Sequence, residues 1–263
     1  MQTTESVQFE VPFRGECLIG TRSAVLNHSP VALILHGGGT SCVVGFQELR
    51  AFLHARQIAT VAFDAIGHGD TGGAQLGTSL EDRVEQVVSV VRHLDLQTSA
   101  MSLIGFSMGA YVAVKAASEL GIPRLGLAIP AAYATHAYRV PFGPNFSEIL
   151  RAPASWADSD AFDLVAAYAG HLLVISAEAD WVVPPEIPAK YISVATVSAS
   201  QRHHVVRGAG HSLSEHYARA PQARDAAYTE IARLCQRDPE INHHAVSRLH
   251  SSLPTIAPCV QSR

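Results

Sequence analysis

Short apolar segments alternate with stretches of helical periodicity along this chain, and this alternation limits the accessible folds more than any other feature. The apolar segments have the length of buried strands and cover residues 7–11, 17–25, 31–36, 59–65, 101–106, 125–130, 171–177 and 203–208. The helical segments cover residues 46–58, 79–94, 108–120 and 214–236. Strands that alternate with helices form βαβ units, so the sequence predicts an α/β protein with a mostly parallel sheet.

Capping residues mark the ends of the predicted helices. Ser79 stands at the N-cap position of the strongest helical segment, and Asp82 follows three residues later, which is the spacing of a capping box. Gly121 follows the next helix and is a typical C-cap residue. Pro221 lies near the start of the last helix and is expected to break its first turns.

Length and composition favour one large domain. The 263 residues are 48% hydrophobic and 16% charged, which fits a globular chain with a sizeable core. We expect a single α/β domain over residues 1–236. Within it, residues 131–170 are too long for a usual αβ loop and are rich in aromatic residues and proline, so they predict a small lid. Residues 237–263 lack periodicity and predict a loosely ordered tail.

Charge and cysteine content exclude several classes of partner. The net charge of −4 and the isoelectric point of about 6.4 give no reason to expect nucleic acid or an anionic membrane as a partner. The four cysteines lack CxxC spacing, which predicts neither a zinc site nor a disulfide framework. The N-terminus has no signal-peptide pattern and no apolar run reaches the length of a membrane span. We therefore expect a cytoplasmic monomer or homodimer.

The sequence Gly105-Phe106-Ser107-Met108-Gly109 lies between a predicted strand and a predicted helix. It matches the G-x-S-x-G pattern of a nucleophile elbow, in which a strained backbone lifts the serine hydroxyl above the sheet. Glycines two positions before and after the serine avoid steric clashes in this turn. The pattern favours Ser107 as a nucleophile; the alternative is an ordinary turn whose serine only caps the helix.

A nucleophilic serine needs a histidine base and a carboxylate to orient that base. In elbows of this type the acid and then the histidine follow the serine along the chain. Asp180 follows the apolar segment 171–177, with Glu178 as its nearest rival, and His211 follows the segment 203–208. The alternatives are an Asx-turn residue for the aspartate and a surface or capping histidine.

Three consecutive glycines follow the buried strand that ends at His36. Glycine backbones approach a ligand closely, and their N–H groups can donate to a developing oxyanion. We expect the N–H groups of Gly38 and Met108 to form the oxyanion hole, with Gly39 as a third candidate donor. A phosphate-binding loop is disfavoured because no G-K-[ST] sequence follows.

Taken in order over residues 31–213, the stretches "LILHGGG", "FDAIGHGDT", "LIGFSMGA", "ISAEADWVVP" and "GAGHS" resemble the motifs of the α/β-hydrolase superfamily. The resemblance implies an eight-stranded, mostly parallel sheet with helices on both faces. It also implies Ser107, Asp180 and His211 as the catalytic triad. The motifs are nearly silent about substrate, and the short insert 131–170 departs from members with large helical caps.

Two patterns are interpreted as structural, and no cofactor or metal is expected. "GHGDTG" (67–72) satisfies G-x-G-x-x-G, but no helix opens directly after it, so a dinucleotide site is disfavoured. We expect His68 and Asp70 to stabilise this turn. The histidine pairs at 203–204 and 243–244 have no carboxylate or cysteine at metal-ligand spacing.

The resemblance and the triad together favour a serine hydrolase that cleaves an ester or thioester of a small acyl substrate. An acyltransferase or a cofactor-free perhydrolase would use the same residues, and a non-catalytic binding protein on the same scaffold is the remaining alternative. The aromatic residues of 131–170 have two interpretations, the wall of an acyl pocket or the core of the lid. A small lid predicts short or medium acyl groups, or a compact ring-bearing substrate.

Overall fold

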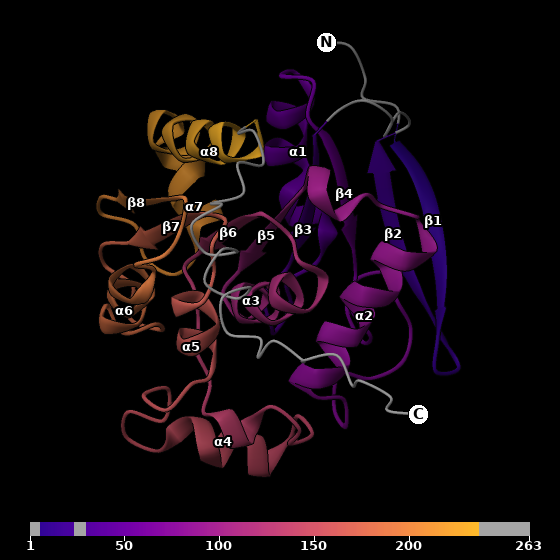
Figure 1. The fold of residues 1–263 in the computed structure, drawn as a ribbon. Helices are drawn as coiled ribbons and strands as arrows, with labels where there is room; N and C mark the ends of the chain where they lie inside the picture. Colours follow the sequence, from indigo (N-terminus) through magenta and orange to yellow (C-terminus); the bar gives the residue numbers. More distant parts are fainter. Residues whose placement is uncertain (1–5, 24–29, 237–263) are drawn as a thin grey trace, which may run out of the picture.

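A computed structural model describes residues 6–23 and 30–236, and its centre is an eight-stranded sheet in the order β1-β2-β4-β3-β5-β6-β7-β8 (Figure 1). Strands β3 to β8 run parallel to their neighbours, while the β1–β2 hairpin is antiparallel and also joins β4 in antiparallel fashion. The strands are β1 (Ser6–Phe13), β2 (Glu16–Ser23), β3 (Val31–Leu35), β4 (Ala59–Phe63), β5 (Met101–Phe106), β6 (Arg124–Ala128), β7 (His171–Ala177) and β8 (Ser200–Val206).

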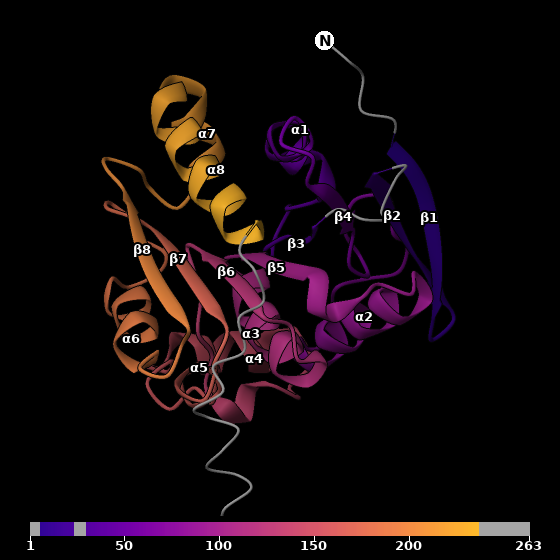
Figure 2. The ribbon, with the colours of Figure 1, turned by 45° about the horizontal axis from the view of Figure 1, so that its top comes forward.

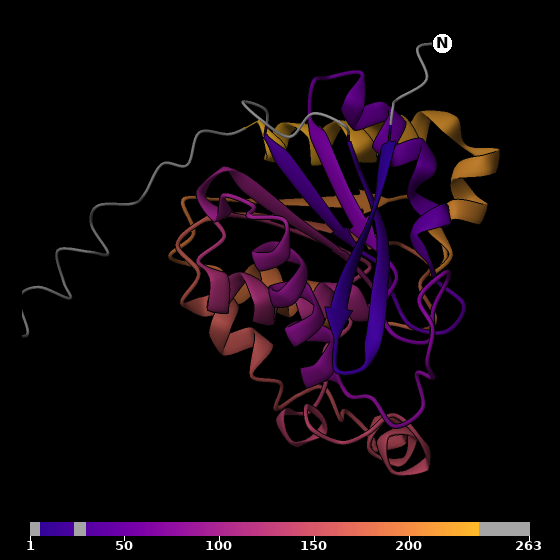
Figure 3. The same cartoon turned by 90° about the vertical axis from the view of Figure 1, so that its right-hand side faces the viewer.

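Helices cover both faces of this sheet, so the protein has the predicted α/β architecture. Helices α1, α7 and α8 lie on one face, and α2, α3, α5 and α6 lie on the other (Figure 2). The sheet twists strongly from the β1–β2 hairpin to β8, as the view toward the hairpin edge shows (Figure 3). The helices are α1 (Gln47–His54), α2 (Leu80–His93), α3 (Met108–Leu120), α4 (Pro144–Arg151), α5 (Ala161–Ala166), α6 (Glu186–Val194), α7 (Leu213–Arg219) and α8 (Pro221–Cys235).

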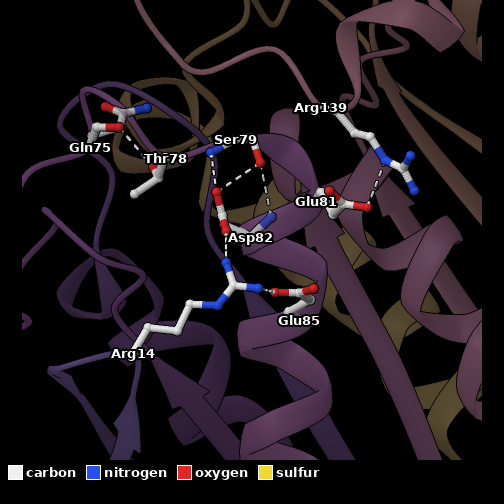
Figure 4. A network of polar contacts seen from close by, with 8 residues as sticks. All are labelled: Arg14, Gln75, Thr78, Ser79, Glu81, Asp82, Glu85 and Arg139. Atoms are coloured by element: carbon white, nitrogen blue, oxygen red, sulfur yellow. Dashed lines mark hydrogen bonds and ion pairs between the residues drawn. The ribbon is translucent and has the colours of Figure 1, made fainter.

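The start of α2 is held from three directions (Figure 4). Ser79 and Asp82 form the predicted capping box, with the Ser79 N–H donating to Asp82 Oδ2 over 2.8 Å. Arg14, in the turn of the β1–β2 hairpin, donates to the carboxylates of Asp82 and Glu85. Arg139 of the insert donates to a carboxylate oxygen of α2's first turn over 2.9 Å. The first turn of α2 is therefore fixed against both the hairpin and the insert.

The expected break at Pro221 is confirmed: the predicted segment 214–236 is two helices, because α7 ends before Pro221 and the proline occupies the first position of α8, where its missing N–H needs no partner. Two other interpretations of secondary structure need correction. Helix α6 was not predicted, since its short apolar run contains Pro188 within the first helical turn. Strand β8 begins at Ser200, three residues before the predicted segment 203–208. Its first residues are polar and therefore lack the apolar pattern that predicts a buried strand.

Residues 131–170, the insert, lie between β6 and β7 and contain α4, α5 and a 3₁₀ turn, η3 (Thr135–Ala137). Tyr133, Phe142 and Phe146 are each less than 10% exposed and belong to the main core cluster beneath the sheet. Their rings contact one another with centroids 4.8–5.8 Å apart. The aromatic residues therefore form the core of the insert, which confirms one of the two interpretations.

Within the described residues, no helix has the length and apolar character needed to cross a membrane. The predicted tail, residues 237–263, lies outside the described residues.

Candidate active site

Ser107 occupies a sharp turn between β5 and α3, with φ of 53° and ψ of −117°. Positive φ is costly for any residue other than glycine, so the backbone of Ser107 is strained. A Cβ atom on Gly105 would lie 2.1 Å from the Gly109 carbonyl oxygen, and one on Gly109 would lie 2.5 Å from the His36 carbonyl oxygen. Both glycines are therefore required by close backbone contacts, and Ser107 lies on an elbow and not in an ordinary cap.

The three residues predicted as a triad are joined by hydrogen bonds. Ser107 Oγ lies 3.0 Å from His211 Nε2, and His211 Nδ1 lies 2.8 Å from Asp180 Oδ2. Ser107 follows β5, Asp180 follows β7 and His211 follows β8, so the carboxyl ends of three parallel strands bring them to one edge of the sheet. In this arrangement the imidazole can accept the serine proton while the carboxylate holds the opposite ring nitrogen.

The carboxylate of Asp180 is fixed by its own loop. Its Oδ1 accepts the N–H groups of Val182 and Val183, each over 2.9 Å, which leaves Oδ2 directed at His211. Glu178 is committed elsewhere: it pairs with Arg207 and accepts the Gly208 N–H over 2.9 Å, and these two donors lower the pKa of its carboxyl. The structure therefore brings Asp180, and not Glu178, to the histidine.

The predicted oxyanion donors flank the serine. Met108 is the first residue of α3, where backbone N–H groups have no acceptor within the helix. A Cβ atom on Gly38 would lie 3.2 Å from Met108 Cε, so the glycine loop and the start of α3 are in contact. Gly39 has φ of 67°, and a Cβ atom placed on it would meet nothing within 4 Å, so it lies on the open side of the loop.

A cleft of about 650 Å³ opens above Ser107 and His211. This volume is in the range of small-molecule sites. One wall comes from the stretch between β3 and α1, a second from the loop after Asp180, and a third from α7 and Tyr228 in the middle of α8. Its apolar and aromatic lining includes Phe46, Leu49, Phe106, Ile129, Trp181, Val182, Leu213, Tyr217 and Tyr228.

No residue of the insert lines this cleft as the described part of the chain forms it. The buried insert aromatics pack instead against the core: Tyr133 contacts Tyr111 of α3 with ring centroids 5.1 Å apart, and the Phe142 ring lies 5.9 Å from the Arg83 guanidinium carbon of α2. The predicted limit on acyl length rested on the size of the insert and loses its basis. The cleft is lined instead by loops and helices of the core fold.

Sequence reasoning missed Trp181 as a cleft residue. It follows Asp180 directly and its side chain is 86% exposed at the cleft. The neighbouring Val182 is 49% exposed and also lines the cleft, so the two side chains form an exposed apolar patch, and such patches often mark binding sites. The signal was present in the sequence as a tryptophan in the loop after the acid.

The turn 67–72 is organised by Asp64, which sequence reasoning also missed. Asp64 Oδ2 accepts the Asp70 N–H over 3.1 Å and its Oδ1 accepts the Val43 N–H over 2.8 Å. A Cβ atom on Gly69 would overlap the Asp64 carboxylate at 2.0 Å, which explains the glycine. His68 stabilises the turn as predicted, through Ile66, whereas Asp70 contributes its backbone N–H.

Part of the chain matches a family model and a curated protein. A family model described as serine aminopeptidase, S33, matches residues 27–151. Protein phosphatase methylesterase 1 of Bos taurus is 37% identical over 102 residues, which are 38% of this chain and 27% of that protein. The chain thus matches only about a quarter of the length of this curated relative.

Solved structures share the fold at low sequence identity. An esterase of Pyrococcus furiosus superposes with a TM-score of 0.64 at 20% identity, covering 88% of this chain and 93% of that one. The thioesterase domain from the curacin biosynthetic pathway superposes with a TM-score of 0.63 at 17% identity, covering 89% and 100%. The sheet order, the serine elbow and these superpositions define an α/β-hydrolase fold. Over residues 27–151 the chain is similar to the family of that model, and its fold is that of the α/β hydrolases.

Proposed function

We propose that this protein is a serine hydrolase that cleaves a carboxylic ester or thioester through an acyl-enzyme. The observation that carries the proposal is the hydrogen-bonded series Ser107–His211–Asp180, of which Ser107 and His211 line an open cleft. Support for an ester or thioester comes from the names of similar proteins, which include a methylesterase, an esterase and a thioesterase.

In the first half-reaction, Ser107 Oγ attacks the substrate carbonyl while His211 Nε2 takes the hydroxyl proton. The carbonyl oxygen becomes negative and accepts hydrogen bonds from the N–H groups of Gly38 and Met108. The tetrahedral intermediate then expels the alcohol or thiol, which takes the proton from His211. Asp180 holds the imidazolium throughout and remains ionised.

In the second half-reaction, His211 removes a proton from water, and the resulting hydroxide attacks the acyl carbon. Collapse of this second intermediate releases the carboxylic acid and returns the proton to Ser107. The mechanism uses side chains and backbone N–H groups of this chain alone. An acyltransferase would differ only in the nucleophile that enters at this step.

The first test is trapping with a fluorophosphonate probe, followed by a panel of p-nitrophenyl esters and acyl-thioesters. We expect covalent labelling of Ser107, located by peptide mass spectrometry, and release of free acid. Incubation with an added alcohol separates hydrolysis from transfer, because a transferase yields a new ester. Labelling confined to a residue other than Ser107 would contradict the proposal.

Trp181 is expected to bind the apolar part of the substrate. Trp181→Ala removes an indole that is 86% exposed at the cleft, so stability should hardly change. The Michaelis constant for an aryl ester should rise about 5- to 10-fold, since aromatic contacts contribute about 1 kcal/mol. The matched control is Leu76→Ala, which removes an apolar side chain that is 71% exposed away from the cleft. Equal Michaelis constants in both variants and the wild type would exclude a binding role for Trp181.

Gly38 tests the oxyanion hole. A valine there brings a Cβ atom within 3.2 Å of Met108 Cε and tilts the donor peptide. Gly38→Val should lower kcat about 10²-fold, the scale of losing one oxyanion donor, and Gly38→Pro removes the N–H itself. Gly72→Val, in the turn 67–72, is the control, because a Cβ atom there meets only a glutamate side chain at 3.4 Å. If Gly38→Pro folds and turns over at the wild-type rate, the donors lie elsewhere, with Gly39 the first candidate.

A further inference from the structure

Arg83, on the first turns of α2, carries a buried charge with an unusual set of partners. Arg83 is only 5% exposed. Among the described residues, no carboxylate lies within ion-pair distance of its guanidinium. Its Nη1 donates to the Gly37 carbonyl over 3.2 Å, and its Nη2 lies 2.9 Å from His68 Nε2. Buried cations are normally paired with an acid, so this one needs another explanation.

The Gly37 carbonyl is held by a second donor, His36. The Nε2 atom of His36 accepts the Ala65 N–H over 3.0 Å, so the ring proton must be on Nδ1, which lies 2.7 Å from the Gly37 oxygen. Burial, the Arg83 charge and His68 lower the pKa of His36 to about 3. The imidazole is therefore neutral near pH 7 and its tautomer is fixed, with Nδ1 as a donor.

The two hydrogen bonds that the Gly37 carbonyl oxygen accepts determine the direction of the Gly38 N–H. The Gly37 carbonyl and the Gly38 N–H belong to one planar trans peptide and point in opposite directions. Arg83 and His36 hold the carbonyl on the α2 side of the loop, whereas Ser107 lies against Gly37 with its Cβ 3.3 Å from a Cβ placed there. Fixing the carbonyl thus fixes the direction in which the Gly38 N–H can donate.

We propose that Arg83 is a positioning residue for the oxyanion hole: its guanidinium orients the Gly37–Gly38 peptide and places an uncompensated positive charge behind the Gly38 donor. This inference rests on the proposed function, because it concerns the oxygen that becomes negative when Ser107 attacks. A fixed donor backed by a fixed charge stabilises that oxygen without reorganisation during the reaction.

The insert supplies the low-dielectric surroundings that make such a charge effective. The Phe142 ring centroid lies 5.9 Å from the guanidinium carbon, and the buried Tyr133 phenol is close enough to affect the charge. Burial lowers the pKa of Arg83 to about 10, so the guanidinium remains protonated at neutral pH. The contacts in Figure 4 fix the start of α2 that carries this residue. The insert thus contributes to the site by surrounding the Arg83 guanidinium, and not by lining the cleft.

The test compares Arg83→Met with Arg83→Lys. The methionine removes charge and donors while it keeps apolar contacts, and the lysine keeps the charge. We expect kcat about 10- to 100-fold lower for the methionine variant with an unchanged Michaelis constant, and partial recovery for lysine. Inhibition by a trifluoromethyl ketone, which adds to Ser107 Oγ and forms an oxyanion, should weaken by the same factor.

Arg50→Met is the matched control, because Arg50 is also partly buried, has no carboxylate partner among the described residues, and donates to Thr21 and Thr60 on the opposite face of the sheet. It should lower the melting temperature without lowering kcat. If Arg83→Met fails to fold, Arg83→Gln is used instead, because glutamine removes the charge and keeps an N–H donor. Its affinity for the trifluoromethyl ketone then tests the effect of the charge. Wild-type ketone affinity in the folded variant overturns the inference. Activity that survives Ser107→Ala overturns the proposed function instead, so the two failures are distinct.

Discussion

Ser107→Ala is expected to lower kcat for any true substrate by about 10⁴-fold or more, with a small change in the Michaelis constant. The hydroxyl is the only group of the elbow that can form the acyl-enzyme, and its partner His211 Nε2 lies 3.0 Å away. Without it, the oxyanion donors and the cleft can only assist direct attack by water. Steady-state kinetics on the best ester of the panel measure the effect, and the fluorophosphonate signal should vanish.

His211→Ala should be as damaging as Ser107→Ala, and the double variant should be no worse than either alone. The serine and histidine act as one unit, so removal of one leaves nothing for the other to do. Additive losses would indicate that the two side chains act independently, against the hydrogen-bonded geometry.

Another serine–histidine contact of the chain, between Ser176 and His203, serves as a matched control. Ser176 Oγ lies 2.7 Å from His203 Nε2, between neighbouring strands and away from the glycine loop. Ser176→Ala should keep wild-type turnover and probe labelling. Near-wild-type turnover by Ser107→Ala, or loss of labelling in Ser176→Ala alone, would refute the mechanism.

The features of the fold that could be predicted from the sequence are mostly those that depend on local sequence patterns. The capping box at Ser79 and the left-handed C-cap at Gly121, with φ of 65°, lie where the sequence places them, because capping depends on neighbouring backbone groups. Helix α6 was missed because its stability comes from Ile187 and Tyr191 packing beneath the sheet, a contact that local propensity does not encode.

The hydrogen-bonded residues of the candidate active site could be predicted for a different reason. Ser107, Asp180 and His211 each follow a buried strand, and parallel strands bring their carboxyl ends to one edge. The cleft walls were not predictable, since Tyr217 and Tyr228 come from helices whose approach to the site depends on how α7 and α8 turn at Pro221. Arg83 was hidden for the same reason, because only the packing of α2 shows that it reaches the Gly37 carbonyl.

The second large effect is expected at the acid. Asp180→Asn should lower kcat by about 10³- to 10⁴-fold with little change in the Michaelis constant. The N–H groups of Val182 and Val183 both donate to Oδ1, so the asparagine oxygen will take that position and turn its amide NH₂ toward His211. Nδ1 must then accept a hydrogen bond, which moves the ring proton to Nε2. That nitrogen can no longer accept the proton of Ser107, although the loop keeps both of its backbone hydrogen bonds.

Glu178→Gln is the matched comparison, two residues earlier in the same loop. Glu178 pairs with Arg207 and accepts the Gly208 N–H, and its side chain is 42% exposed. Exposed ion pairs contribute little to stability, so the variant should keep kcat within about twofold and unfold at nearly the same temperature. Kinetics and thermal unfolding by circular dichroism on both variants decide the matter. Equal loss of kcat in two well-folded variants would mean that the histidine takes its orientation from Glu178, and the loop after β7 would then have to rearrange when substrate binds.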